Sequence, residues 1–171
     1  MKSIIFIILT INLAFSAVFD FKTISSNFIQ TITNEEKSKI IYEGKFWATS
    51  DAKALWIYKK PVEKKIYFNK NRVVILEPEL EQAIITNLKH TPNLTEILKN
   101  SKKISNNIFE AIYEDITYKI ELKNGTIEKI FYEDKLANEV VIKFFNQQTN
   151  LFLDEKLFVP KIPNYYDIIA Q

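Results

Sequence analysis

The chain has no cysteine, a single histidine and only two glycines among its 171 residues. Without cysteine, disulfide frameworks, thiolate metal sites and Cys nucleophiles are excluded. A lone His90 excludes zinc sites that need two or three imidazoles, and Gly44 and Gly125 alone cannot build a glycine-rich phosphate loop. A GxSxG nucleophile motif is also missing, which disfavours a hydrolase. We therefore expect no metal, no cofactor and no enzymatic activity.

An excess of charge of one sign is missing as well, since 23 Lys and Arg stand against 21 Asp and Glu. The net charge of +2 does not predict a surface that binds nucleic acid. Lysines gather around Pro61, but elsewhere Lys and Glu alternate, which is typical of the water-facing side of a sheet. Hydrophobic residues make up 47% of the chain, enough for one globular domain with a core of its own.

Residues 1–16 have the pattern of a secretory signal peptide: a positive charge, an apolar run and small residues at the end. The apolar run has about ten residues, whereas a membrane-spanning helix needs ~20, so a membrane anchor is disfavoured. We predict cleavage after Ser16 or Ala17 and an exported protein with a single domain over residues 17–171.

Alternating apolar and polar side chains predict about ten or eleven short strands joined by polar turns. Asn124-Gly125 is the strongest hairpin signal. Because strands and helices do not alternate, a parallel sheet is excluded. The fold class predicted is mainly β, a strongly curved, unclosed antiparallel barrel. The predicted strands and extended terminal segments are Phe28–Thr33, Lys39–Thr49, Ala54–Lys59, Lys65–Phe68, Val73–Glu77, Gln82–Thr86, Ile108–Tyr113, Thr117–Lys123, Thr126–Tyr132, Glu139–Phe145, Phe158–Pro163 and Tyr165–Ile169.

Two short helices are predicted to cover the inner face of this sheet. Val18–Ser25 has apolar residues at helical spacing after the capping residue Asp20. Thr91–Lys99 has Thr91 as its cap and a proline at the first helical position. Its apolar stripe consists of Leu94, Ile97 and Leu98.

Apolar side chains are in surplus on the face that these helices cover. One interpretation is a close-packed core, the usual meaning of an apolar stripe, and the other is a cavity under a movable lid that suits acyl chains or an amphipathic partner. The sheet residues expected on that face are Phe46, Trp56, Tyr58, Ile66, Phe68, Val74, Tyr118, Ile120, Val140, Ile142 and Phe144.

A series of short motifs, taken in order, resembles the LolA family of periplasmic lipoprotein carriers. Each motif alone is weak, but their order and spacing cover nearly the whole chain. They are Phe28-Ile29-Gln30, Gly44-Lys45-Phe46-Trp47, Trp56-Ile57-Tyr58 with Pro61, Leu76-Glu77-Pro78-Glu79-Leu80-Glu81-Gln82, Thr91-Pro92, Asn124-Gly125-Thr126-Ile127 and Phe158-Val159-Pro160-Lys161-Ile162-Pro163.

The resemblance implies an unclosed barrel with a helical lid over a hydrophobic cavity, working in the periplasm. It implies a chaperone that takes acylated lipoproteins from an inner-membrane ABC-type exporter and delivers them to an outer-membrane acceptor, and we expect a monomer. A carrier of another lipid or amphiphile is the alternative, and an anti-sigma-factor regulator of similar shape is a third. The cavity is expected to be lined by Tyr42, Phe46, Trp56, Tyr58, Val74, Leu94, Ile97, Leu98 and Phe144.

The chain departs from the family at the turn after the G-x-F-W motif. Members commonly carry Arg-Pro there, and that Arg locks the lid by hydrogen bonds, whereas this chain has Ser50-Asp51. Lys53 is the nearest cation, but a lysine lacks the planar fork of donors of arginine. With Ser50 and Lys53 at the lid-lock position, we expect a lid held mainly by apolar contacts.

Overall fold

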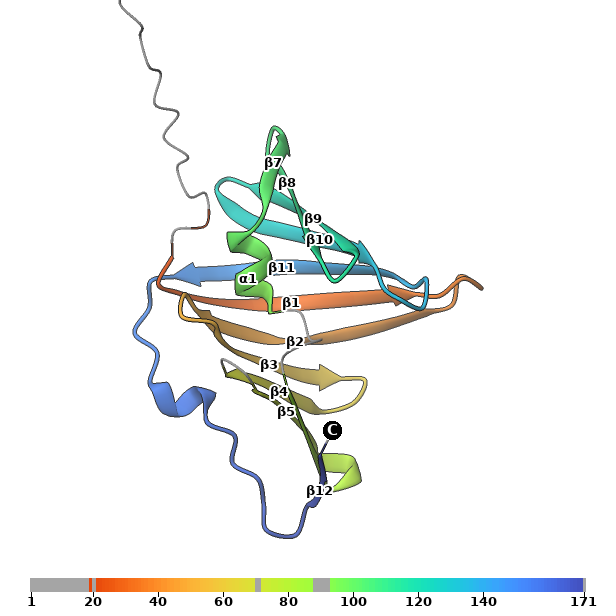
Figure 1. Cartoon of the computed structure of the whole chain (residues 1–171), viewed down its shortest axis with the longest axis vertical. Coiled ribbons are helices and arrows are strands. Elements are labelled where there is room, and N and C mark those ends of the chain that lie inside the picture. Colours follow the sequence, from red (N-terminus) through yellow and green to blue (C-terminus); the bar gives the residue numbers. More distant parts are fainter. Residues whose placement is uncertain (1–18, 20, 70–71, 88–92, 171) are drawn as a thin grey trace, which may run out of the picture.

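The computed structural model describes Phe19 and residues 21–69, 72–87 and 93–170; the predicted signal peptide lies outside these residues. The described strands form one open, curved sheet in the order β12-β6-β5-β4-β3-β2-β1-β11-β10-β9-β8-β7 (Figure 1). The predicted fold class is confirmed, with twelve strands rather than ten or eleven. The strands are β1 Thr23–Thr33, β2 Lys39–Thr49, β3 Lys53–Lys60, β4 Lys64–Asn69, β5 Arg72–Glu77, β6 Gln82–Asn87, β7 Lys102–Ser105, β8 Ile108–Tyr113, β9 Ile116–Lys123, β10 Thr126–Glu133, β11 Glu139–Thr149 and β12 Asp167–Ala170.

Neighbouring strands are antiparallel except at one edge, where β12 lies parallel to β6. The Asn124-Gly125 hairpin predicted between β9 and β10 is present, and both of its residues have positive φ, as the turn requires. Among the described residues, three short helices interrupt the strands. They are η1 Pro78–Leu80, α1 Leu94–Lys99 and η3 Glu155–Phe158.

The predicted helix over Val18–Ser25 is wrong from Thr23 onward, because β1 begins there. Alternate residues of β1 from Ile24 to Gln30 are buried, which is the period of a strand. β1 pairs with both β2 and β11 along its length, so its backbone groups are satisfied on both sides. This tertiary pairing overrides the helical spacing of the aromatic residues. The predicted terminal strand over Phe158–Pro163 is not formed either, since Phe158 ends η3.

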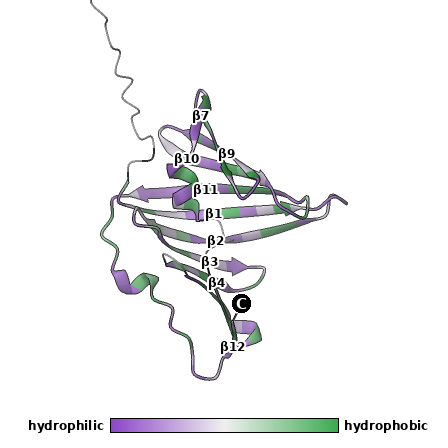
Figure 2. Cartoon of the chain, in the orientation of Figure 1, coloured by the Kyte–Doolittle hydropathy of each residue, from purple (hydrophilic) through white to green (hydrophobic). Residues whose placement is uncertain are grey.

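Apolar side chains pack on both faces of the sheet. On the inner face, the inner cluster joins residues of the strands to Leu94, Ile97 and Leu98 of α1. On the outer face, the outer cluster joins Leu55, Tyr67, Val74, Leu76 and Ala83 to Phe158. Hydrophobic and hydrophilic residues are accordingly interleaved along the strands (Figure 2).

The outer cluster is covered by the segment between β11 and β12. This C-terminal segment leaves β11, passes through η3 and returns to the opposite edge of the sheet as β12 (Figure 1). Phe158 is its anchor, with 2% of its surface exposed. Leu153, Leu157, Ile162 and Tyr166 of the same segment pack around this cluster. The outer face of strands β3 to β6 is therefore covered by the chain itself.

Gly44 lets three aromatic side chains meet in the inner cluster. It stands directly between Phe28 on β1 and Tyr58 on β3 in the register of the three strands. With no side chain there, the Phe28 ring makes edge contacts with Tyr58 at 5.1 Å and with Trp56 at 4.9 Å between ring centroids. A Cβ at position 44 would lie 2.1 Å from the Ile57 carbonyl oxygen and 2.6 Å from the Phe28 ring.

We predict that Gly44→Ala lowers the free energy of unfolding by about 1–3 kcal/mol, because the backbone oxygen of Ile57 cannot move aside as a side chain can. Urea denaturation followed by far-UV circular dichroism measures the change. Gly125→Asn is the control, since Asn tolerates positive φ and no atom lies within 4 Å of a Cβ at that position. Equal stability of Gly44→Ala and the parent chain would contradict this account of the aromatic packing.

Candidate functional site

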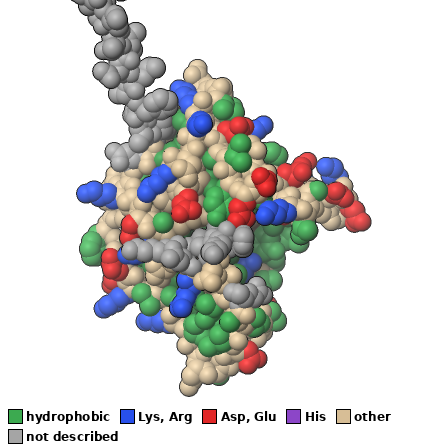
Figure 3. All heavy atoms as spheres, viewed as in Figure 1, with side chains coloured by type: hydrophobic (Ala, Val, Ile, Leu, Met, Phe, Trp, Pro, Cys, Tyr) green, Lys and Arg blue, Asp and Glu red, His purple; other side chains and the backbone are tan. Residues whose placement is uncertain are grey.

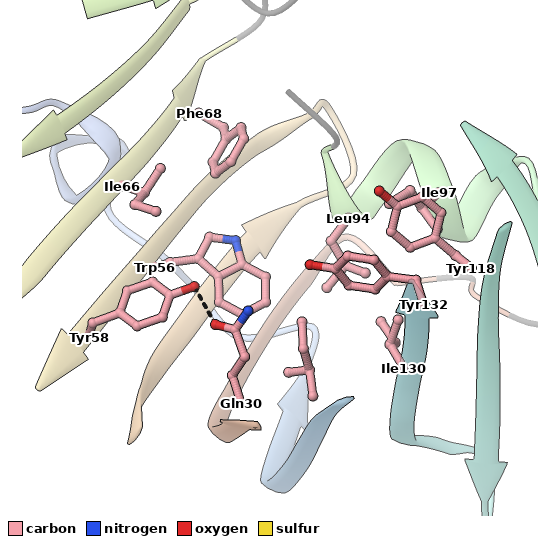
Figure 4. A pocket seen from close by; sticks show the side chains of 11 residues that line it. Gln30, Trp56, Tyr58, Ile66, Phe68, Leu94, Ile97, Tyr118, Ile130 and Tyr132 are labelled. Atoms are coloured by element: carbon pink, nitrogen blue, oxygen red, sulfur yellow. Dashed lines mark hydrogen bonds between the residues drawn. The ribbon is translucent and has the colours of Figure 1, made fainter. Parts of the chain in front are cut away.

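A cavity of about 160 Å³ lies between the inner face of the sheet and α1 (Figure 4). Strands from both halves of the sheet supply its walls, and α1 closes it from the other side with Leu94 and Ile97. Apolar and aromatic side chains dominate the lining. The lining residues are Gln30, Trp56, Tyr58, Ile66, Phe68, Leu94, Ile97, Tyr118, Ile130, Tyr132 and Ile142.

The structure brings most of the predicted cavity residues together. Trp56, Tyr58, Leu94 and Ile97 lie on the cavity wall. Phe46, Leu98 and Phe144 belong to the inner cluster behind that wall, where the rings of Phe46 and Trp56 lie 4.3 Å apart. Tyr42 packs against the same cluster, edge-on to Tyr58 at 5.6 Å. Packed core and cavity are therefore parts of one inner face.

The prediction that Val74 lines the cavity is wrong. Val74 pairs with Tyr67 and belongs to the outer cluster, under the C-terminal segment. Its neighbour Val73 pairs with Phe68 and is fully buried on the inner face. Because side chains alternate along a strand, an error of one residue in the facing of β5 exchanges one valine for the other.

The cavity wall also carries polar side chains that the apolar pattern did not predict to be there. Gln30 is 8% exposed, and its carboxamide oxygen accepts a hydrogen bond of 3.0 Å from the Tyr58 hydroxyl. Burial raises the pKa of the Tyr58 phenol well above its usual value and the pKa of Tyr132 to about 12. Both phenols are therefore neutral hydrogen-bond donors at physiological pH. Gln30 was visible only as the last residue of the Phe28-Ile29-Gln30 motif.

We call α1 the lid helix, since it lies across the cavity. It begins after Asn93, whose side chain caps it by accepting from the Thr95 amide at 3.0 Å. The predicted cap Thr91 and the proline after it lie outside the described residues. Leu94, Ile97 and Leu98 are all buried, as the apolar stripe predicts.

Side chains of the lid helix also bond to the backbone of the turn between β2 and β3. The Asn93 amide nitrogen donates to the Ala52 carbonyl at 2.9 Å, and the Lys99 ammonium donates to the Ser50 carbonyl. The Thr95 hydroxyl lies 3.5 Å from the Thr49 carbonyl. The expectation of a lid held mainly by apolar contacts left these three polar contacts out.

Lys53 makes its ion pairs away from the lid helix. Its ammonium group pairs with Asp51 at 3.3 Å and with Glu155 of η3 at 3.2 Å, so it points to the outer face of the sheet. These two carboxylates raise the pKa of Lys53. Ser50 does take part in the lock, through its backbone carbonyl rather than its hydroxyl. The lid-lock role of these two positions stays a prediction: Ser50 contacts the lid helix through its backbone, and Lys53 makes its ion pairs away from it.

Charges outside the cavity are mixed. Lys and acidic side chains are interspersed on the face shown in Figure 3, with no broad area of one sign. Within the described part of the chain, no three His, Asp or Glu side chains are grouped as metal ligands are. Among these same residues, no helix has the length and apolar character needed to cross a membrane.

Known proteins resemble the chain in both sequence and fold. Residues 20–108 match the family described as outer membrane lipoprotein carrier protein LolA. Outer-membrane lipoprotein carrier proteins of Campylobacter jejuni and Wolinella succinogenes are each 38% identical to it. The alignments cover 98% of both chains for the first, and 92% of this chain and 91% of the relative for the second. A LolA superfamily protein from Nitrosomonas europaea, 10% identical, shares the fold with a TM-score of 0.53 over 83% of this chain and 92% of that one.

We predict that Asn93→Ala loosens the lid helix, because it removes both the cap and the bond to the Ala52 carbonyl. Hydrogen exchange of the Glu96 and Ile97 amides, which bond to the Asn93 carbonyl, should accelerate about five- to thirtyfold. Asn100→Ala, at the other end of the helix, is the matched control and should change little. Equal exchange in both variants would show that the cap and its bond do not hold the lid.

Proposed function

Because the chain belongs to the LolA family of outer-membrane lipoprotein carrier proteins, we propose that it carries lipoproteins through the periplasm, with their acyl chains in the cavity under the lid helix. The observation that carries this proposal is the apolar cavity between the inner face and the lid helix. The work is binding and release, so no residue is assigned a covalent step. A carrier of another amphiphile is not favoured, since the relatives that align along the chain are named lipoprotein carriers.

The cavity is small for an acyl chain. Its volume of 160 Å³ is close to the ~150 Å³ cavity that holds one benzene molecule in an engineered protein. Ligand pockets commonly measure ~300–1,000 Å³. We infer that the lid helix must move away from the sheet before an acyl chain can enter.

Burial of the cargo can drive this opening. Each buried methylene contributes about 0.8 kcal/mol, so a chain of ten contributes ~8 kcal/mol. The lid's polar contacts are worth about 0.5–1.5 kcal/mol each, and somewhat more for the charged Lys99. Opening the lid also exposes its three buried aliphatic side chains, so the net affinity is lower than burial of the cargo alone would give, which favours release.

The route of the cargo follows from the same family membership. We propose that an inner-membrane ABC-type exporter loads the carrier and that an outer-membrane acceptor unloads it. The chain acts in the periplasm as a monomer, after its N-terminal signal peptide has been removed. The lid helix covers part of the apolar surface on the inner face, and the C-terminal segment covers part of it on the outer face.

We predict that Ile66→Glu abolishes cargo binding and leaves the fold intact. Ile66 is half-buried on the cavity wall, so a carboxylate there can be hydrated when the cavity is empty but not when an acyl chain fills it. Binding of a fluorescent diacylated peptide to the purified protein measures the effect, and thermal unfolding checks the fold.

Ile57→Glu is the matched control for this experiment. Ile57 is also half-buried and lies on the neighbouring strand β3, but it packs against the outer cluster. Its variant should bind the peptide as the parent does. Loss of binding in both variants, or in neither, would contradict the assignment of the inner face as the cargo site.

A further inference from the structure

Polar side chains stand on opposite walls of the cavity (Figure 4). Gln30 of β1, Tyr58 of β3 and Tyr132 of β10 all line the cavity, and their polar atoms stand among aliphatic and aromatic side chains. Lys64 marks the outer end of this group, since its ammonium lies 4.9 Å from the centre of the Tyr58 ring and 5.7 Å from that of Tyr42. We call Gln30, Tyr58 and Tyr132 the polar group of the cavity.

The polar group presents donors to the cavity. The Gln30 carboxamide oxygen accepts from the Tyr58 hydroxyl, which fixes the carboxamide so that its two N–H hydrogens are the donors it offers a ligand. Figure 4 shows this carboxamide directed toward Trp56, and the Tyr132 hydroxyl directed into the cavity from the opposite wall. The Tyr132 phenol also raises the pKa of Tyr58, which agrees with the two residues facing each other.

A purely aliphatic ligand does not match this wall. Methylene groups cannot accept a hydrogen bond, so a donor that loses water to a methylene group destabilises the complex. A ligand that brings a carbonyl oxygen to this point avoids that cost. Sites built to hydrogen-bond a ligand therefore discriminate against analogues that lack the bonding group.

Resting on the proposed function, we propose that the polar group binds the carbonyl oxygens of the ester and amide bonds that join acyl chains to their head group. Gln30 N–H and the Tyr132 hydroxyl donate to these carbonyls, and Tyr58 holds the Gln30 carboxamide in place. The chains then lie along the apolar remainder of the wall, toward Ile142 and Ile130, with the head group toward Lys64. The cavity thus recognises the ester or amide bonds of its cargo as well as the acyl chains.

The experiment compares ester-linked with ether-linked ligands, since an ether keeps the chains and removes the carbonyl oxygen. The probes are a peptide with a glyceryl-modified cysteine and a short-chain phosphatidylethanolamine. Each is made as a diacyl (ester) and as a dialkyl (ether) compound and is titrated into the mature protein. The parent protein should bind the ester peptide about three- to tenfold more tightly than the ether peptide. If the phospholipid shows the same ester-to-ether ratio, the site recognises the glyceryl ester in any lipid. If only the peptide shows this ratio, the site recognises the ester only when it belongs to a lipopeptide.

Tyr132→Phe and Gln30→Leu should each bring the ester-to-ether ratio toward one. Tyr132→Phe removes a single oxygen and keeps the ring, so it tests the proposal even if Gln30→Leu fails to fold. Tyr67→Phe is the control, because Tyr67 is buried in the outer cluster, away from the cavity, and its variant should keep the parent ratio.

Three outcomes would contradict the proposals, and they separate the polar group from lipoprotein carriage. Saturable binding of ester and ether ligands with equal affinity by the parent protein overturns the polar group as a binding site and leaves lipoprotein carriage standing. A ratio that persists in Tyr132→Phe and in a folded Gln30→Leu overturns it as well. Failure of the parent protein to bind either peptide contradicts the proposed function itself.

Discussion

The half of the curved sheet that contains β3 to β6 is apolar on both faces and must be covered on both sides, and the rest of the molecule follows from how the chain does this. The outer face is closed by the C-terminal segment, with Phe158 buried among strand residues. The inner face is closed by a six-residue helix, too short to be stable alone. The two covers differ in kind: one is a long segment fixed at both ends by strands of the sheet, and the other is held by three buried aliphatic side chains and contacts to one turn. A cover of the second kind can open without disturbing the sheet.

Strand period predicted most of this architecture, because half-buried strands carry a strong alternation of side chains. The period of the apolar residues does not distinguish helix from strand where both spacings fit. The aromatic residues near Phe21 fit a helix as well as a strand, and the pairing with β2 and β11 that decides the matter is not a local property. The exchange of Val73 for Val74 has a similar origin, since a run of apolar residues in β5 gives no alternation to read.

The lid contacts lay beyond sequence reasoning for another reason. The sequence points to side chains of the turn, but the acceptors in the structure are the backbone carbonyls of Ser50 and Ala52, which every residue type offers. The donors are on the helix instead, at Asn93 and Lys99. Placing the donors on the moving element leaves the sequence of the turn free to vary as long as its backbone keeps its shape. The polar group of the cavity was equally hidden, because the bond between Gln30 and Tyr58 spans a strand that separates them.

The two edge strands of the sheet determine how readily copies of the protein associate at high concentration. An exposed edge strand is a template on which another chain can add its own strand. Here both edges, β7 and β12, are only four residues long, and β7 carries two adjacent lysines. The parallel return of β12 also occupies the edge of the six-residue strand β6. Copies of this protein therefore find little on each other to extend, which favours dispersal over fibrous assembly in a crowded compartment.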